Sequence, residues 1–345
     1  MFNYVQDYVK TILPSKCKIS PSGWLSFNAP CCTHNGESVD TRSRAGLHTD
    51  PDGSLSYHCF NCNFKASYQP GRHLTFKFRK LLSWLGADDG EVRRLVIEAI
   101  RIRDLISPED IKQEPEETFT FDKRSLPKRA VSFETLMTFC QLNDQQPTVL
   151  HSFGHFHDAV KYCYDRDIDM TQYQFYLSDS LEHNLAKRVI IPFYWQNELV
   201  GYTARAIYDD VKPKYYSNHE PNFVFNTNMQ RPDWKFVIVC EGPFDAMAVD
   251  GVAILGNEVS EQQANIIDSL GRQVIVVADR DKAGVKMIDA AIKYNWSVSY
   301  PVWQETCKDI NEAVVKYGKL FVLKTIIDAT ETNKLKIELK KKIHA

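Results

Sequence analysis

Two acidic elements follow apolar, β-branched runs in the segment between Phe236 and Gly284. Glu241 comes after Phe-Val-Ile-Val-Cys, and Asp279 and Asp281 come after Gln-Val-Ile-Val-Val-Ala. Such runs are typical of buried parallel strands, and each is followed by a segment that can form a helix. The acids then lie at the C-terminal ends of strands, where open α/β sheets bind ligands. We therefore predict an α/β fold with a metal-dependent phosphoryl-transfer site.

The spacing of Asp279 and Asp281 favours metal binding. In an extended backbone their side chains point to one face, roughly 6–7 Å apart along the strand, and this face can hold one or two Mg²⁺ ions. The alternative is that these acids only cap the following helices, which a single Asp-x-Asp does not exclude. The second strand that ends in Glu-Gly and the downstream Lys308-Asp309-Ile310-Asn311 favour the metal site.

The composition is that of an ordinary globular protein. The 345 residues, 43% hydrophobic and 25% charged, suffice for two or three domains. No apolar run approaches the length of a membrane span, and the N-terminus lacks the pattern of a signal peptide. The nine cysteines are an odd number and partly in metal-like spacing. We therefore expect a protein of the reducing cytoplasm, without a membrane partner, that uses thiolate chemistry rather than disulfides.

The net charge of −2 does not point to a nucleic-acid partner. A nucleic-acid-binding protein with this balance has to concentrate its positive charge locally. Two such clusters occur, and the alternative for both is a solvated helix face. Their members are Arg72, Lys77, Arg79 and Lys80 in the first cluster, and Arg93, Arg94, Arg101 and Arg103 in the second.

Cysteine and histidine pairs near the N-terminus have metal-ligand spacing. Cys31-x-x-His34 and Cys59-x-x-Cys62 supply four ligands for a closed tetrahedral site suited to structural Zn²⁺. Cys32 is the main alternative ligand, and His58 is a lesser one. The competing interpretation is that these cysteines pack as small hydrophobic side chains.

The region around these pairs is expected to be a small β-rich module that needs a metal to complete its fold. A rigid module of this kind can present basic and aromatic side chains to single-stranded bases, although the same residues can also complete the fold or face water. The candidates for such contacts are Arg42, Arg44, His48, Phe60, Phe64 and Lys65.

The middle of the chain contains a strand–turn–strand pattern over residues 188–206. A basic residue stands at each end, Arg188 and Arg205, and Lys214 follows in Pro-Lys-Tyr. Together these three residues can neutralise a triphosphate or a nucleic-acid backbone, and the planar guanidinium group suits this task. Taken singly, each is more often a surface charge.

The motifs together resemble known families. Glu241-Gly-Pro-Phe-Asp245-Ala, Asp279-Arg-Asp-Lys-Ala-Gly and Lys308-Asp-Ile-Asn resemble the Toprim fold shared by primases, topoisomerases and some nucleases, over roughly residues 234–315. The basic middle segment resembles the RNA-polymerase core of bacterial and phage primases. With the cysteine module ahead of it, the resemblance covers nearly all of residues 20–315, and tailed-phage DNA primases match best.

Two departures from this pattern matter. Primases usually have Cys-x-x-Cys at the first knuckle, where this chain has Cys31-Cys32-Thr-His34, so the ligand choice stays open. The sequence also lacks the Gly-x-x-x-x-Gly-Lys-Ser/Thr motif of the P-loop helicase that is fused to some phage relatives.

The resemblance implies a DNA primase that copies single-stranded DNA into short RNA primers for lagging-strand replication. Glu241, Asp279 and Asp281 would hold one or two Mg²⁺ ions, for which Mn²⁺ can substitute, in a two-metal nucleotidyl transfer. Supporting roles would fall to Asp245, Lys308 and Asp309. Arg188, Arg205 and Lys214 would bind nucleotide and template. The alternatives are a Toprim topoisomerase or nuclease, and a non-catalytic zinc-dependent accessory protein that binds single-stranded DNA.

The resemblance also implies partners and a division of the chain. The partners would be single-stranded DNA, ribonucleoside triphosphates, a separate hexameric replicative helicase and a single-strand-binding protein, in the host cytoplasm if a phage encodes the chain. The basic tail with Leu335, Ile337 and Leu339 is a candidate helicase contact, and a frayed terminus is the alternative. The predicted parts are 1–78 (zinc-binding, template recognition), 79–125 (helices and an acidic, flexible linker at 107–118), 126–231 (basic part of the polymerase core), 232–315 (Toprim) and 316–345 (helical region and tail).

Overall fold

The computed structural model describes residues 4–72, 74–105, 119–142, 153–179, 184–279, 282–303 and 307–344. The predicted acidic linker at 107–118 lies outside these residues. The chain divides into two compact units. The first comprises Met1–Thr118, Pro232–Phe236 and Ala264–Val274, and the second Phe119–Arg231, Val237–Gln263 and Ile275–Ala345. Within the described ranges, no helix has the length and apolar character that crossing a membrane requires.

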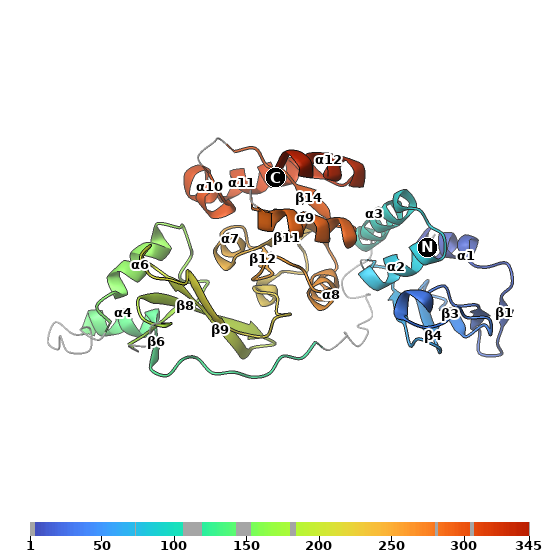
Figure 1. Cartoon of the computed structure of the whole chain (residues 1–345), viewed down its shortest axis with the longest axis horizontal. Helices are drawn as coiled ribbons and strands as arrows, with labels where there is room; N and C mark the ends of the chain where they lie inside the picture. The colour runs from blue at the N-terminus through green and yellow to red at the C-terminus, as the bar shows by residue number, and fades with distance from the viewer. Residues whose placement is uncertain are drawn as a thin grey trace. The chain divides into compact units, whose positions relative to one another are not determined.

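A five-stranded antiparallel sheet forms the centre of the first unit (Figure 1). Each strand pairs with the next along the chain, and alternate residues such as Leu47 and Tyr57 are buried on one face. This alternation follows from the two-residue period of a strand. The strands are β1 (Lys18–Ile19), β2 (Leu25–Phe27), β3 (Ala45–Thr49), β4 (Leu55–Cys59) and β5 (Lys65–Tyr68). The prediction of a β-rich N-terminal module with clustered cysteines is confirmed.

Three helices complete the hydrophobic core of this module. They are α1 (Tyr4–Ile12), α2 (Phe76–Trp84) and α3 (Asp89–Leu105), and a short 3₁₀ turn, η1, spans Thr33–Asn35. Leu81 of α2 and Leu95 of α3 are fully buried in the same core as Leu47 of the sheet. The predicted division after residue 78 therefore falls inside α2, because the sheet needs these helices to cover its apolar face.

An antiparallel sheet opens the second unit, with the strand order β10-β9-β8-β7-β6. The predicted strand–turn–strand is the β8–β9 hairpin. Its turn residues Gln196 and Asn197 have φ of 48° and 66°, the left-handed pair of a two-residue turn that matches the strand twist. The strands are β6 (Ala130–Ser132), β7 (Tyr176–Ser178), β8 (Arg188–Trp195), β9 (Glu198–Ala206) and β10 (Tyr215–Asn218), with helices α4 (Phe133–Leu142), α6 (Phe156–Tyr164) and η3 (Thr227–Met229).

A second sheet, in the order β12-β11-β13-β14-β15, carries the predicted acidic strand ends. β11 pairs in parallel with β12, and β13 in parallel with β14, while β15 joins the edge antiparallel. The predicted parallel α/β arrangement is thereby confirmed. The strands are β11 (Phe236–Cys240), β12 (Val252–Ala253), β13 (Gln273–Val276), β14 (Ser297–Ser299) and β15 (Thr330–Glu331).

Helices connect and follow the strands of this second sheet. They are α7 (Pro243–Ala248), α8 (Glu261–Ser269), α9 (Lys282–Lys293), α10 (Ile310–Tyr317), α11 (Lys319–Asp328) and α12 (Lys334–His344). The predicted C-terminal region thus contributes an edge strand to the sheet. Its tail also packs, because Ile337 of α12 is buried and its carbonyl accepts a hydrogen bond from the Tyr300 hydroxyl at 3.0 Å.

Candidate active site and metal centre

The acidic residues lie where two neighbouring strands of the second sheet end. Glu241 directly follows β11, and Asp279 comes three residues after β13. The next helix begins at once after Glu241, with Gly242 as its N-cap and Pro243 in its first turn. This is the position that proline favours, because its missing N–H would have no partner in the helix. Asp245 then falls in the first turn of α7.

Asp245 is held close to other carboxylates. Its Oδ1 accepts a hydrogen bond from the backbone N–H of Asn311 at 3.0 Å, which joins α7 to the start of α10. Burial, with added repulsion from Asp309 and Asp279, raises the pKa of Asp245 to about 7. A bound cation would remove this penalty, so the cluster has the electrostatics of a cation site.

Asp309 has a structural task in addition to its charge. It is the N-cap of α10, and its Oδ1 accepts a hydrogen bond from the backbone N–H of Glu312 at 2.8 Å. Glu312 in turn accepts one from the backbone N–H of Lys308 at 2.8 Å, which completes a reciprocal cap. The Lys308 side chain is exposed, and no interaction among the described residues brings its ammonium group to the carboxylates.

Gly284 is required by the geometry at Asp279. A Cβ at position 284 would lie 2.0 Å from the Asp279 carbonyl oxygen, far inside van der Waals contact. The first turn of α9 therefore packs directly on the backbone that carries Asp279. Asp281 lies outside the described residues, so the predicted pairing of its side chain with Asp279 stays a prediction.

The carboxylates near the end of β11 are candidate ligands for Mg²⁺. Asp245, Asp279 and Glu241 all contribute to raising the pKa of the buried Cys240 thiol, after burial itself, so the three carboxylates lie near the end of β11. Carboxylate oxygen atoms are the ligands that Mg²⁺ prefers. Among the described residues, which leave out Asp281, no three carboxylates converge as closely as the four thiols described below. The donor chemistry fits Mg²⁺, and Asp281 is the predicted ligand that the described part lacks.

Basic and aromatic side chains from the first sheet of this unit face the acids. The Arg205 guanidinium lies 4.6 Å from the ring centre of Tyr215, and the Tyr215 hydroxyl would be 4.0 Å from a Cβ on Gly242. Desolvation and Arg205 lower the pKa of Lys214, against the attraction of Asp309. Arg205 Nε is buried without a hydrogen-bond partner among the described residues. Lys214 therefore lies within electrostatic reach of Asp309 and Asp245, and Arg205 lies within electrostatic reach of Lys214.

Arg166 is a further cation that the sequence analysis missed. It follows α6, and its guanidinium lies 3.7 Å from the ring centre of Tyr162 and 5.8 Å from that of Phe244 in α7. Its carbonyl accepts a hydrogen bond from Asn311 Nδ2 at 2.8 Å. No motif surrounds Arg166, and only the packing of α6 against α7 and α10 reveals its position.

Arg188 occupies a different environment from Arg205. Its side chain is fully buried, and Nη1 donates to the carbonyl oxygen atoms of Ala204 and Lys214 at 3.3 Å each. Burial lowers the pKa of Arg188. The structure thus gives Arg188 a part in fixing the backbone at Lys214, and direct contact with a nucleotide stays a prediction.

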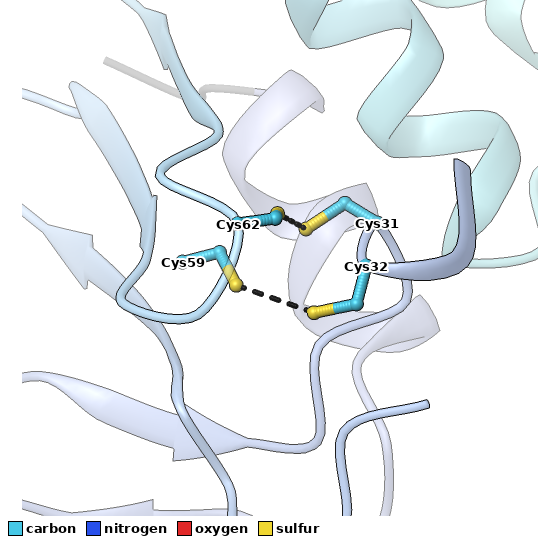
Figure 2. A group of neighbouring side chains, drawn as sticks. All are labelled: Cys31, Cys32, Cys59 and Cys62. Carbon is cyan, nitrogen blue, oxygen red and sulfur yellow. Dashed lines mark hydrogen bonds between the residues drawn. The ribbon is translucent and has the colours of Figure 1, made fainter. Parts of the chain in front are cut away.

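Four cysteine thiols converge in the first unit (Figure 2). Cys31 Sγ lies 3.4 Å from Cys62 Sγ, Cys32 Sγ lies 3.6 Å from Cys59 Sγ, and all four sulfur atoms lie within 4.8 Å of one another. A tetrahedral site with Zn–S bonds of about 2.3 Å places its sulfur atoms about 3.8 Å apart. The four thiols therefore fit a zinc ion closely.

We correct the predicted ligand set, because Cys32 takes the place of His34 in this group. Cys32 has helical backbone angles at the start of η1, and this turn directs both adjacent thiols inward. His34 is exposed, and its ring stacks on Trp84 at 4.8 Å with an interplanar angle of 8°. His58, the lesser alternative, is also outside the group and contacts Phe60.

Polar groups around the thiols suit bound thiolates. Asn61 Nδ2 donates to Cys32 Sγ at 3.2 Å, and the Tyr57 hydroxyl lies 3.2 Å from Cys31 Sγ. Burial raises the pKa of Cys32 to about 11. Burial also opposes ionisation of Cys59, but backbone N–H groups and the Cys32 thiol outweigh it and lower the pKa of Cys59. A cation at the centre would favour the thiolate form of all four cysteines.

The candidates for template contact differ in exposure. Phe60 is 70% exposed beside the cysteine knuckle, whereas Phe64 packs against Tyr57 and Trp84. Arg42, His48 and Lys65 are exposed or partly exposed, and Arg44 Nε is bound to the buried Asp40 at 3.0 Å. One residue of the first basic cluster, Arg79, is also buried, in an ion pair with Asp268 at 2.5 Å.

Parts of this chain are similar in sequence to a known domain family and to known proteins. Residues 238–314 match the Toprim-like family. The DNA primase of Aquifex aeolicus (strain VF5) is 26% identical over 152 residues, which cover 39% of this chain and 30% of that primase. The DNA primase of Campylobacter jejuni subsp. jejuni serotype O:2 is 31% identical over 116 residues, or 29% of this chain and 19% of that primase. The aligned chain thus spans less than a third of the length of either relative.

Solved structures show a weaker likeness. The zinc-binding and RNA polymerase domains of the Aquifex aeolicus primase give a TM-score of 0.43 at 17% identity, over 94% of this chain and 83% of that chain. A DnaG primase catalytic domain bound to ssDNA gives a TM-score of 0.42 at 18% identity, over 57% of this chain and 79% of that chain.

The segment 238–314 that matches the Toprim-like family includes every described carboxylate of the cluster. The chain therefore contains a Toprim-like domain that carries Glu241, Asp245, Asp279 and Asp309.

Proposed function

We propose that this protein is a DNA primase, which copies single-stranded DNA into short RNA primers by nucleotidyl transfer. The observation that carries the proposal is the carboxylate cluster of a Toprim-like domain, with Lys214 within electrostatic reach of it and Arg205 near Lys214. Nucleotidyl transfer needs this combination, because cations bind the triphosphate and carboxylates bind the metal. The DNA primases that match part of the chain support the same function.

Glu241, Asp279 and Asp281 are the proposed ligands of Mg²⁺, for which Mn²⁺ can substitute. When bound, one or two such ions would activate the primer 3′-hydroxyl and stabilise the leaving pyrophosphate. Asp245 adds negative charge, and its bond to the Asn311 N–H fixes α7 against α10. Asp309 caps α10 beside the cluster, and Lys308 stays a proposed triphosphate contact.

The basic side chains are proposed to bind phosphate groups. Arg205 and Arg166 are held against aromatic rings, so little side-chain entropy is lost when a phosphate binds. The exposed Lys214 can follow the phosphates of either nucleotide or template. Arg188 is proposed to act mainly through the backbone of Lys214, to which it is hydrogen-bonded.

The four-cysteine group is proposed to hold structural Zn²⁺. Bound zinc would tie η1 to the loop after β4, and the module would select the template site at which priming starts. Phe60 supports this role, because an exposed aromatic ring beside the metal can stack on an unpaired base. We further propose a separate hexameric helicase and a single-strand-binding protein as partners, and a cytoplasmic location.

A primer-synthesis assay tests the proposal directly. Purified protein, a single-stranded DNA template, the four ribonucleoside triphosphates and Mg²⁺ should yield short RNA products that disappear with EDTA. The same preparation should neither relax supercoiled DNA nor cleave it. Relaxation or cleavage without RNA synthesis would assign the site to a topoisomerase or nuclease. Template binding without any product would identify a non-catalytic accessory protein.

A further inference from the structure

A cavity of about 360 Å³ lies beside β8 in the second unit. β7 pairs with β8 at Tyr176 and Ile190, and the cavity is found where β8 continues beyond that pair, at Ile191, Pro192 and Tyr194. Pro192 has no N–H to offer a neighbouring strand, which suits a position where the sheet opens. The volume is in the range of small-ligand pockets.

The described residues that line this cavity are uncharged. Its floor is apolar, with the buried side chains of Ile191, Pro192 and Phe225, and its exposed rim carries the amides of Gln174, Asn197 and Asn228. Among the residues that the structure describes, no Asp, Glu, Lys or Arg lines it. The carboxylate and guanidinium groups of the proposed active site form the opposite kind of environment. A ligand part that enters the cavity is therefore neutral, with apolar faces and polar edges.

Hydrogen-bonding groups of the lining have capacity left for a ligand. The Tyr173 hydroxyl accepts a hydrogen bond from Asn226 Nδ2 at 3.2 Å, and within the described part of the chain its own hydrogen has no acceptor. Gln174 Oε1 lies 3.2 Å from the Tyr194 hydroxyl and 3.3 Å from that of Tyr176, which leaves the Nε2 donors available. The cavity thus offers both O–H and N–H donors, together with the carbonyl oxygen atoms of the rim amides.

We propose that this cavity binds one unpaired nucleobase of a single-stranded nucleic acid. A nucleobase is planar and neutral, and it has donors and acceptors along its edge. Amide side chains match these edges, and aromatic rings such as Tyr194 stack on base faces. Because none of the described residues that line the cavity is a phosphate-binding cation, the base belongs to a strand whose phosphates lie outside it. This inference rests on the proposed function, because the strand is taken to be the DNA template that a primase copies.

Binding of a fluorescently labelled single-stranded oligodeoxynucleotide to the full chain tests this proposal. Asn228→Trp places an indole ring at the cavity rim, where it should keep a base from entering. Binding should weaken roughly tenfold, which corresponds to the loss of one stacked base. An oligonucleotide of the same length that consists only of abasic sites should bind the variant and the wild type equally. Gln141→Trp, at an exposed amide of α4 that does not line the cavity, is the matched control and should change neither affinity.

Further measurements separate the outcomes. Thermal unfolding checks the fold of Asn228→Trp, and Asn228→Ala with Gln172→Ala removes two exposed amides and should weaken binding by a few-fold at least. Unchanged affinity in both variants, or an equal loss with the abasic oligonucleotide, would overturn the proposal. The cavity could instead take the base of a free nucleoside. Saturation-transfer NMR with free ribonucleosides tests this alternative. If nucleosides lose binding in Asn228→Trp while the oligonucleotide does not, the strand assignment is wrong. Primer synthesis by the wild type on the same template shows separately whether the proposed function holds.

Discussion

Substituting Gly284 by alanine separates local helix preference from the geometry of the site. In an exposed helix, alanine is favoured over glycine by about 1 kcal/mol. At position 284 the added Cβ would lie 2.0 Å from the Asp279 carbonyl oxygen and 3.0 Å from its carbonyl carbon. The backbone must therefore move by more than about 1 Å, and overpacking of this kind costs about 1–3 kcal/mol. Taking about 3 kcal/mol for so close a contact, we expect a net loss of about 2 kcal/mol in the free energy of unfolding.

The same displacement should act on activity. A shift of about 1 Å in a catalytic group can cost about 100-fold in rate, and Asp279 is the residue that has to move. Thermal unfolding without metal should show a melting temperature lower by about 4–8 °C, and primer synthesis should fall by about two orders of magnitude. Gly256→Ala is the control, because nothing lies within 4 Å of a Cβ there and its φ is ordinary. A Gly284→Ala variant that is more stable than the wild type and fully active would refute the reasoning.

Three further perturbations test other parts of the account. Cys32→Ser should reduce the zinc content measured by atomic absorption and lower the stability of the module, whereas His34→Ala should retain one zinc per chain; the reverse result would restore His34 as a ligand. Arg205→Ala should raise the KM for ribonucleotides roughly 10- to 100-fold with little change in melting temperature, as the loss of a charge-assisted bond predicts. Unchanged kinetics would make Arg205 a structural cation. Leu335→Ser with Leu339→Ser, at side chains 69% and 55% exposed, should reduce helicase stimulation but spare unstimulated synthesis; equal loss of both would assign α12 to the fold.

Point substitutions in α12 test a helicase contact better than removal of the tail would, for a structural reason. The sequence predicts a basic terminal helix, which can either fray or bind a partner. In the structure Ile337 is buried, Lys341 is paired with Asp289 of α9, and Tyr300 is hydrogen-bonded to the Ile337 carbonyl. Removal of residues 333–345 would therefore disturb the packing on α9. The exposed leucines of α12 can report on a partner without this effect.

Strand ends and hairpins were predictable because their signals are local. The apolar runs before Glu241 and Asp279 and the alternating pattern of residues 188–206 correspond to β11, β13 and the β8–β9 hairpin. The choice between Cys32 and His34 was not predictable in this way. Both spacings satisfy the ligand pattern, and the backbone angles of one residue, Cys32, decide which side chain turns inward.

The remaining features depend on contacts between distant segments. Arg166 reaches the site only through α6, whose neighbours are far away in sequence, and it has no motif around it. The burial of Arg188 likewise depends on the segment just before β10, whose Lys214 carbonyl accepts a hydrogen bond from it. The inclusion of α2 and α3 in the N-terminal core follows from the need of the sheet for an apolar cover, which spacing alone does not reveal. The predicted flexible linker and Asp281 lie outside the described residues and stay predictions.

The central claim is that the Toprim-like carboxylates bind catalytic metal, and Asp279→Asn tests it most directly. The amide keeps the size and shape of the side chain and one acceptor oxygen atom, but it binds Mg²⁺ poorly. We expect unchanged melting temperature and unchanged affinity for single-stranded DNA, with Mg²⁺-dependent RNA synthesis reduced at least about 100-fold. Primer synthesis at close to the wild-type rate by the Asp279→Asn protein would contradict the account.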